Sequence, residues 1–233
     1  MTDAFDAIRA CDSFDDVRLA FRDAIAVEGY TASACGAFLP APDGPAAHFF
    51  FLDWPEGWRK LYIERNFAAV DFSVAEARQR ISPFTWLEAK ATRSMAPAER
   101  DLWSTVLAWG WSDGFSVPIH GPAGYFGLVT MAGKFRALSL ATRRHLQMLA
   151  IAAHDRCRAL AGRDPAIGPS EPLTPRELES LRWVAAGLTD PQISAAMDIS
   201  ATTVKSHVDA ARRKLTAHTR AHAVARMILL GLG

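Results

Sequence analysis

The chain has 233 residues, a formal net charge of +1 and a hydrophobic share of 50%. This length suits one large and one small globular domain, and the composition excludes a disordered chain. The N-terminus lacks the basic and apolar regions of a signal peptide, and apolar runs fall short of the about 20 residues of a membrane span, so we expect a cytoplasmic protein with no membrane partner.

The first 160 residues predict a mixture of helices and strands. Residues 4–27 predict two helices that break near Asp12, with Ser13 as the N-cap of the second. Residues 56–69 predict one helix with Trp58 and Tyr62 on the same face. The other expected elements are strands over 30–39 and 48–54, an extended piece at 84–86, a helix over 97–110, a hairpin of 114–120 with 125–133, and a long helix over 139–161.

A Pro- and Gly-rich stretch, "AGRDPAIGPSEP" at 161–172, predicts a linker between two domains. Thr174, Pro175 and Glu177 then form a capping-box pattern that begins a helix, which Gly187 ends. Four helices are expected in this second domain, over 175–186, 190–197, 201–215 and 218–230. The second and third are joined by a tight turn at 198–200, which is typical of a helix-turn-helix, and Ile193 and Ala196 are expected to face inward.

Positive charge is concentrated in the predicted helix 201–215. Residues 170–233 hold 8 Lys and Arg against 6 Asp and Glu, whereas residues 1–169 hold 18 against 19. The helix places an apolar stripe opposite a cationic face, which fits the major groove of DNA, although charge alone fits a solvated helix face equally well. The stripe consists of Val204, Val208, Ala211 and Leu215, and the candidate DNA-binding residues are Thr202, Thr203, Lys205, Ser206, Asp209, Arg212 and Arg213. Asp209 either accepts a hydrogen bond from cytosine or tethers Arg213.

The segment "LTPRELESLRWVAAGLTDPQISAAMDISATTVKSHVDAARRKL" resembles the LuxR-type helix-turn-helix over its full length. The matching positions are Glu177, Leu181, Gly187, the run Ile199 to His207, and Arg213 to Leu215. The resemblance implies that 190–197 is a scaffold helix and 201–215 the recognition helix on a double-stranded DNA operator. It also implies that a last helix near 218–231 supports a homodimer.

The N-terminal region resembles the autoinducer-binding domain of quorum-sensing LuxR-type regulators, through Trp58, Tyr62, Asp71, Trp86 and Gly114. The resemblance implies an acyl-homoserine lactone whose lactone carbonyl accepts from the Trp58 indole and whose amide N–H donates to Asp71. Tyr62 and Trp86 would wall the pocket. A lactone-amide head group in an apolar cavity needs one donor and one acceptor from the protein, which an indole and a carboxylate can supply. The plainer alternatives are a helix N-cap for Asp71 and core packing for the aromatic residues.

Other positions bear on the acyl part of the ligand. By position in the resemblance, Ser73 and Thr130 are candidate hydroxyls near the acyl carbonyl. Trp54 stands where the family commonly has Tyr, and Phe72 where it usually has Pro. Both changes add aromatic bulk, which leads to the hypothesis of a short, branched or aryl acyl group.

Together these observations predict an α+β fold. We expect an N-terminal α/β/α sandwich with a central antiparallel sheet and a C-terminal all-α, four-helix helix-turn-helix domain. The predicted boundaries are 1–162 for the autoinducer-binding domain, 163–172 for the linker and 173–233 for the DNA-binding domain. The expected function is ligand-responsive transcription regulation in quorum sensing; the alternative is a LuxR-type regulator of a different small molecule or of none. Enzyme fingerprints such as HExxH, GxSxG and the P-loop are missing from the sequence, so neither catalysis, a cofactor nor a metal is expected.

Overall fold

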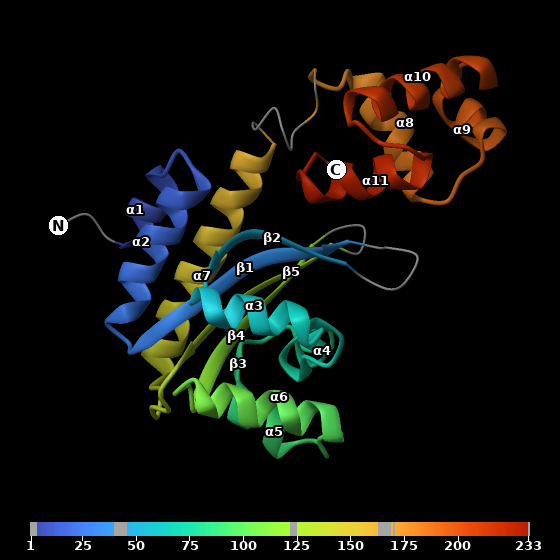
Figure 1. Cartoon of the computed structure of the whole chain (residues 1–233). Helices are drawn as coiled ribbons and strands as arrows, with labels where there is room; N and C mark the ends of the chain where they lie inside the picture. Colours follow the sequence, from blue (N-terminus) through green and yellow to red (C-terminus); the bar gives the residue numbers. More distant parts are fainter. Residues whose placement is uncertain (1–3, 40–45, 122–124, 163–168, 170, 233) are drawn as a thin grey trace. The chain divides into compact units, whose positions relative to one another are not determined.

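The computed structural model describes residues 4–39, 46–121, 125–162, 169 and 171–232. They divide into two units, an N-terminal one built on a sheet and a C-terminal one that is helical (Figure 1). Most of the predicted linker at 163–172 lies outside the described residues, as do residues 40–45 of a predicted loop and 122–124 of the predicted hairpin turn.

The N-terminal unit is built on a five-stranded antiparallel sheet in the order β2-β1-β5-β4-β3. Its strands are β1 (Tyr30–Leu39), β2 (Ala46–Asp53), β3 (Phe84–Thr85), β4 (Asp113–His120) and β5 (Phe126–Gly133). Thr130 on the central strand β5 pairs with Ala34 on one side and with Ser116 on the other. Because directly paired residues point to the same face of a sheet, these three side chains form one row across its middle.

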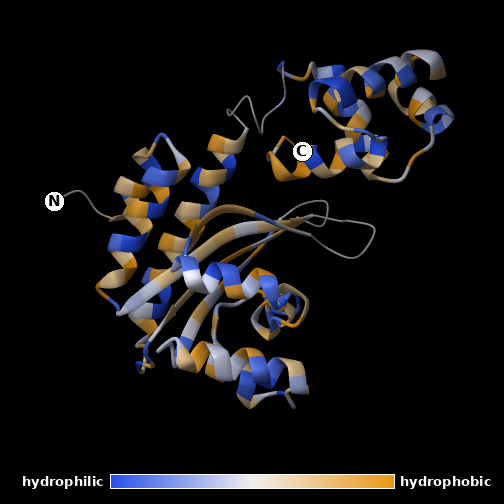
Figure 2. Cartoon of the chain, viewed as in Figure 1, coloured by the Kyte–Doolittle hydropathy of each residue, from blue (hydrophilic) through white to orange (hydrophobic). Residues whose placement is uncertain are grey.

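One face of the sheet is covered by α1 (Ala4–Ala10), α2 (Phe14–Ala26) and α7 (Leu140–Ala161) (Figure 1). The break between α1 and α2 is confirmed, because the Ser13 side chain accepts a hydrogen bond from the Asp16 N–H and caps α2. Figure 2 shows that the strands are largely hydrophobic, while the covering helices carry both hydrophobic and hydrophilic residues. The buried side chains of these helices include Val17, Phe21, Ile25, Leu146, Leu149 and Ala153.

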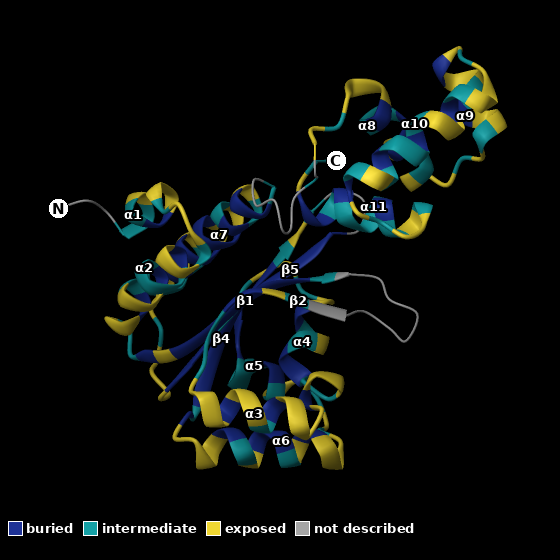
Figure 3. Ribbon diagram, turned by 45° about the horizontal axis from the view of Figure 1, so that its top comes forward, coloured by how far each residue is buried: buried dark blue, intermediate teal, exposed yellow. Residues whose placement is uncertain are grey.

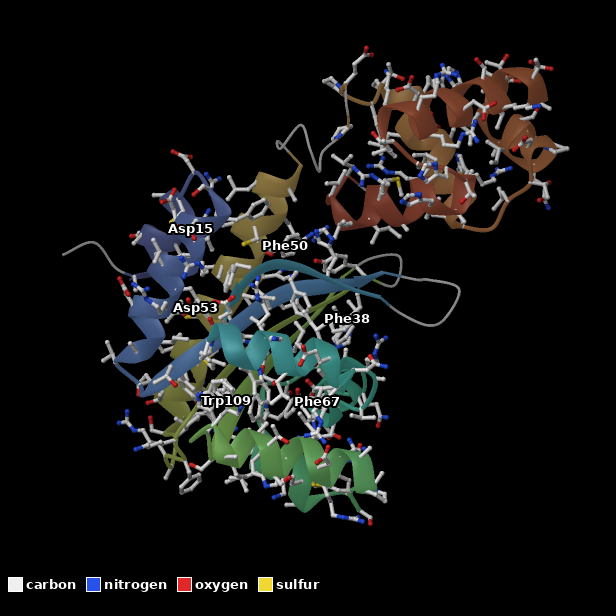
Figure 4. All side chains as sticks on the ribbon, viewed as in Figure 1. Asp15, Phe38, Phe50, Asp53, Phe67 and Trp109 are labelled. Atoms are coloured by element: carbon white, nitrogen blue, oxygen red, sulfur yellow. The ribbon has the colours of Figure 1, made fainter. Side chains whose placement is uncertain are left out.

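The opposite face is covered by α3 (Glu56–Glu64), the 3-10 helix η1 (Phe67–Ala69), α4 (Phe72–Ala77), α5 (Trp86–Ala91) and α6 (Pro97–Ala108) (Figure 1). The prediction of one helix over 56–69 is wrong, because Asn66 adopts a left-handed conformation with φ of 49° and ends it. The extended piece at 84–86 is also corrected, since Trp86 begins α5 behind a capping box of Thr85 and Glu88. Figure 4 labels Phe67 and Trp109 on this side, in the layer between the sheet and α6.

The C-terminal unit contains α8 (Pro175–Ala185), α9 (Asp190–Met197), α10 (Ala201–Lys214) and α11 (Arg220–Leu229). The predicted capping box at Thr174 and Glu177 is present, and all four residues of the predicted α10 stripe are buried. Figure 3 shows that the helices of this unit carry buried as well as exposed residues. Asp198 turns the chain between α9 and α10 in a left-handed conformation with φ of 52°. The inward position predicted for Ala196 is wrong: Ala196 is exposed, and Met197 is buried beside Ile193.

The observed architecture is the predicted one, an α/β/α sandwich with a central antiparallel sheet followed by an all-α domain of four helices. In the part of the chain that the structure describes, the helices are too short or too polar to cross a membrane.

Candidate functional site

Two neighbouring cavities, which we call chamber 1 and chamber 2, lie between the sheet and the helices α3 to α6. Each is partly open to solvent, and the atom-free space of about 490 and 500 Å³ includes open solvent. Chamber 1 is lined by aromatic and small side chains that include Trp58, Trp86, Leu102, Val106, Trp111 and Ala132. Chamber 2 is lined by Ala34, Gly36, Phe38, His48, Phe49, Val74 and Leu128 among others. Five residues line both chambers and form what we call the neck: Trp54, Tyr62, Asp71, Ser73 and Thr130.

All seven residues that the sequence singles out for a ligand line chamber 1, although they come from four elements (α3, α4, α5 and β5) and from two connecting segments. Five of them form the neck, and the other two are Trp58 and Trp86. Phe72, which the sequence marks as added bulk, also lines chamber 1 and packs edge-on against Trp103 at 6.0 Å between ring centroids.

On the helical wall of the neck, Asp71 collects three hydrogen bonds. The Tyr62 hydroxyl donates to Oδ2 at 2.8 Å, and the Ser73 amide and hydroxyl donate to Oδ1 at 2.9 and 2.7 Å. Asp71 is therefore the N-cap of α4, as the plainer alternative predicts, and it faces the cavity as well. Burial and the neighbouring Asp71 carboxylate raise the pKa of Tyr62, so its phenol stays protonated and donates. A carboxylate has about four acceptor positions, so one remains for a ligand donor.

On the sheet wall, hydrogen bonds link three side chains in a row. The Trp86 indole Nε1–H donates to Ser116 Oγ at 3.1 Å, and Ser116 Oγ lies 3.0 Å from Thr130 Oγ1. The indole packs on the bare Cα of Gly114, where a Cβ would overlap three atoms of the ring. Ser116 is fully buried and was not among the predicted site residues. Pairing the predicted strands in register would have placed it beside Thr130.

Two indole groups at the cavity lack acceptors within the described residues. Neither Trp58 Nε1–H nor Trp54 Nε1–H has a hydrogen-bond acceptor there, whereas Trp111, which lines the same chamber, donates to Thr31 Oγ1 at 3.1 Å. Trp58 is only 4% exposed, and both Trp58 and Trp54 line chamber 1. Their N–H groups are therefore candidate donors for whatever occupies it. Trp111 was missed by the sequence reasoning, since it belongs to no motif there.

Chamber 2 is apolar apart from the neck and His48. Its floor is made by small residues of β1, including Ala34 and Gly36, and a Cβ on Gly36 would meet the His48 carbonyl oxygen at 2.5 Å. Phe38 stacks on Phe126 at 5.0 Å, and the Arg78 guanidinium lies 5.0 Å from both ring centroids. Among the described residues, no group of three or more His, Cys, Asp or Glu side chains is placed to hold a metal ion.

The polar face of α10 is the candidate DNA interface, and its residues differ in how firmly they are held. Arg212 is engaged within the unit, since it contacts Asp209 at 3.4 Å and the His218 carbonyl at 3.3 Å. Asp209 therefore pairs with Arg212 and not, as one of the alternatives proposed, with Arg213. Thr203 is half-buried, and its hydroxyl is hydrogen-bonded to that of Ser200. The other candidates are exposed: Thr202, Lys205, Ser206 and Arg213. Within the described residues, neither the Lys205 ammonium nor the Arg213 guanidinium has a hydrogen-bond or ion-pair partner.

An ion pair holds helix α10 to α8, and its contribution to stability should depend on pH. Lys214 Nζ lies 2.9 Å from Glu177, whose carboxylate also accepts from the Thr174 N–H at 2.8 Å. Burial raises the pKa of Glu177, but the bonds from Thr174 and Lys214 outweigh it and hold the pKa below its ordinary value of 4.5. The stabilisation is therefore present above about pH 4.5 and is lost as the pH falls through the lower, folded-state pKa.

We expect Glu177→Gln to lower the free energy of unfolding by about 1–2 kcal/mol at pH 7, and we expect this loss to be smaller at pH 3, below the unfolded-state pKa. Unfolding in urea, followed by circular dichroism at both pH values, measures this. The control is Glu179→Gln, whose ion pair with Arg176 is exposed and should contribute under about 1 kcal/mol. Equal losses at both pH values would contradict the electrostatic explanation.

Comparison with known proteins identifies relatives of both units. A model of the autoinducer binding domain matches residues 13–157, and a model of bacterial regulatory proteins of the luxR family matches residues 171–227. The HTH-type quorum sensing-dependent transcriptional regulator RpaR of Rhodopseudomonas palustris is 37% identical over 213 residues, which cover 91% of this chain and 86% of RpaR. The transcriptional activator protein BjaR1 of Bradyrhizobium diazoefficiens is 35% identical over 191 residues, covering 82% and 78%.

The fold also has a counterpart among solved structures. The crystal structure of SdiA from Escherichia coli matches with a TM-score of 0.71 at 20% identity, over 97% of this chain and 94% of that one. At this level of identity the likeness establishes a common fold for both units and carries no information about the ligand.

Proposed function

The chain belongs to the LuxR family of quorum-sensing transcriptional regulators, and we propose that its cavity binds an acyl-homoserine lactone while α10 reads a DNA operator. As a member of this family it is a ligand-responsive DNA-binding regulator and not an enzyme. The observation that carries the ligand proposal is the neck, where Asp71 with its carboxylate and Thr130 with its hydroxyl line both chambers.

A secondary amide suits the neck because it combines one donor and one acceptor. Its N–H would donate to the free acceptor position of Asp71, and its carbonyl would accept from a hydroxyl of the neck. Of the two candidates, the Ser73 hydroxyl already donates its proton to Asp71, so Thr130 is the one we assign to the carbonyl. The lactone then lies in chamber 1, where Trp58 Nε1–H donates to its carbonyl and Tyr62 and Trp86 form walls. The acyl group extends past Trp54 into chamber 2, whose lining is mostly apolar.

The acyl group itself is proposed to be short, branched or aryl. Chamber 2 has aromatic walls, with Trp54 packed against Tyr62 at 4.9 Å and against Phe49 at 5.8 Å between ring centroids. Phe38, which stacks on Phe126, is a further aromatic residue in the lining of this chamber. Side chains of this size fill space that a long alkyl chain needs, while their faces suit an aromatic or branched group.

This proposal is tested by the melting temperature of the full chain with a series of acyl-homoserine lactones. A ligand at 100 times its dissociation constant adds about 2.7 kcal/mol of stability, which raises the melting temperature of a chain of this size by roughly 5–10 °C. We expect the largest rise with short, branched and aryl acyl groups. A clear preference for chains of about twelve carbons would overturn the acyl proposal. A flat response to every lactone would favour a regulator of another small molecule, or of none.

For the DNA-binding unit, we propose a contact surface with DNA on α10. It consists of Thr202, Thr203, Lys205, Ser206, Asp209, Arg212 and Arg213. A homodimer would present two copies of α10 to the half-sites of a near-palindromic operator, with α11 supporting the dimer. We retain 1–162, 163–172 and 173–233 as the proposed bounds of the sensor, linker and DNA-binding domain. A regulator that acts on operator DNA is placed in the cytoplasm.

A further inference from the structure

The fully buried Ser116 is the central member of the hydrogen-bonded row on the sheet wall, and no motif or family resemblance points to it. We propose that Ser116 is a positioning residue that makes the Thr130 hydroxyl a directed donor for the carbonyl of the ligand amide. This inference rests on the proposed function, because it assigns one contact within the proposed ligand site.

The number of protons on each group determines which member of the row donates each hydrogen bond. An indole N–H can only donate, so Ser116 Oγ accepts from Trp86 and must place its own single proton elsewhere. Among the described residues, Thr130 Oγ1 is the only other hydrogen-bond partner of Ser116 Oγ. If Thr130 donated to Ser116 instead, the Ser116 proton would stay unpaired at a site that water does not reach, which is costly. Ser116 therefore donates to Thr130.

The consequence concerns the proton of Thr130. Its oxygen receives the Ser116 proton, and within the described part of the chain its hydroxyl has no second partner. Thr130 lines both chambers, so its proton is available in the neck, on the wall that faces a ligand amide. On the helical wall of the neck, Asp71 receives three donors and offers only an acceptor. The neck thus has a fixed polarity, with a donor on the sheet wall and an acceptor on the helical wall.

This polarity fixes the direction of a secondary amide, with its carbonyl toward β5 and its N–H toward α4. The two groups on either side of a trans amide then extend in opposite directions from the neck. Each bond in the row also strengthens the next, since a hydroxyl that accepts a hydrogen bond is a better donor. Ser116 does not itself line either chamber, and it acts on the ligand only through Thr130.

The test is a double-mutant cycle in the full chain with two ligands. The first ligand is the acyl-homoserine lactone that stabilises the wild type most, and the second is its analogue with the amide carbonyl replaced by CH2. We expect Ser116→Ala and Thr130→Val each to weaken binding of the amide ligand about 3- to 10-fold, with no further loss in the double variant. Binding of the carbonyl-free analogue should change less than 2-fold in all three variants. Ser116→Thr keeps the hydroxyl and should recover the affinity for the amide ligand.

A matched control separates positioning from a structural role. Thr31→Val removes the hydroxyl that accepts from the Trp111 indole, also at 3.1 Å, but this bond does not lead to Thr130. We expect Thr31→Val to affect both ligands equally. Additive losses in the double variant, or equal losses for both ligands with Ser116→Ala, would overturn the inference while leaving the proposed function intact. A wild type that no lactone stabilises would instead overturn the proposed function and this inference with it.

Discussion

Asp71→Asn is expected to weaken binding of the acyl-homoserine lactone by roughly 10- to 150-fold, because a hydrogen bond to a charged group contributes about 1.5–3 kcal/mol. The carboxylate accepts three hydrogen bonds within the protein, and its remaining acceptor position is the one we assign to the ligand amide. An Asn side chain has the same shape but one oxygen, which the bonds from Ser73 occupy. Its NH2 group would then face the amide N–H with a donor and repel it.

The substitution isolates binding from folding, since Asn is as good an N-cap as Asp and should keep α4 in place. Isothermal titration calorimetry of the purified full chain measures the change in affinity, and the melting temperature without ligand reports on the fold. Asp101→Asn is the control, because Asp101 forms an exposed ion pair with Arg65 away from the cavity lining. Wild-type affinity in a folded Asp71→Asn protein would show that this residue is only a helix cap.

The long elements were predictable because their hydrophobic periods extend over several turns or strand pairs. Helix α2 with its Ser13 cap, the hairpin of β4 and β5, and the buried stripe of α10 all appear as the sequence indicates. The short helices α4 and α5 were missed because six residues do not complete two turns, so no period can emerge. Their caps, Asp71 and Thr85, are the signals that were available.

The ligand cavity was predictable to the extent that its residues belong to motifs. Seven residues chosen from the resemblance line one chamber, while Ser116 and Trp111 were missed. Ser116 contributes through the register of β4 against β5, which is a property of strand pairing and not of any local pattern. For Asp71 the two competing interpretations turned out to be compatible, since a carboxylate that caps a short helix can still face a cavity.

The largest effect on DNA is expected from removing Lys205 and Arg213 together. Each cation that contacts a guanine contributes about 1–3 kcal/mol, so the double variant Lys205→Ala with Arg213→Ala should bind its operator at least about 30-fold more weakly. These two side chains are exposed on α10 and without a partner among the described residues. Binding DNA therefore requires no internal ion pair to be broken, whereas Arg212 must first leave Asp209 and the His218 carbonyl.

This difference predicts an order of effects that a general basic patch would not produce. Gel shifts with the ligand-bound full chain, on an operator selected from random duplexes, should rank Lys205→Ala and Arg213→Ala above Arg212→Ala. Arg176→Ala on α8 serves as the control, because it removes the same charge outside α10. Where a cation contacts a phosphate, the slope of log affinity against log salt should fall by about 0.9 per lost contact. If all four single variants bound equally well, α10 would not be the DNA-reading helix; if all lost affinity equally, binding would depend on net charge alone.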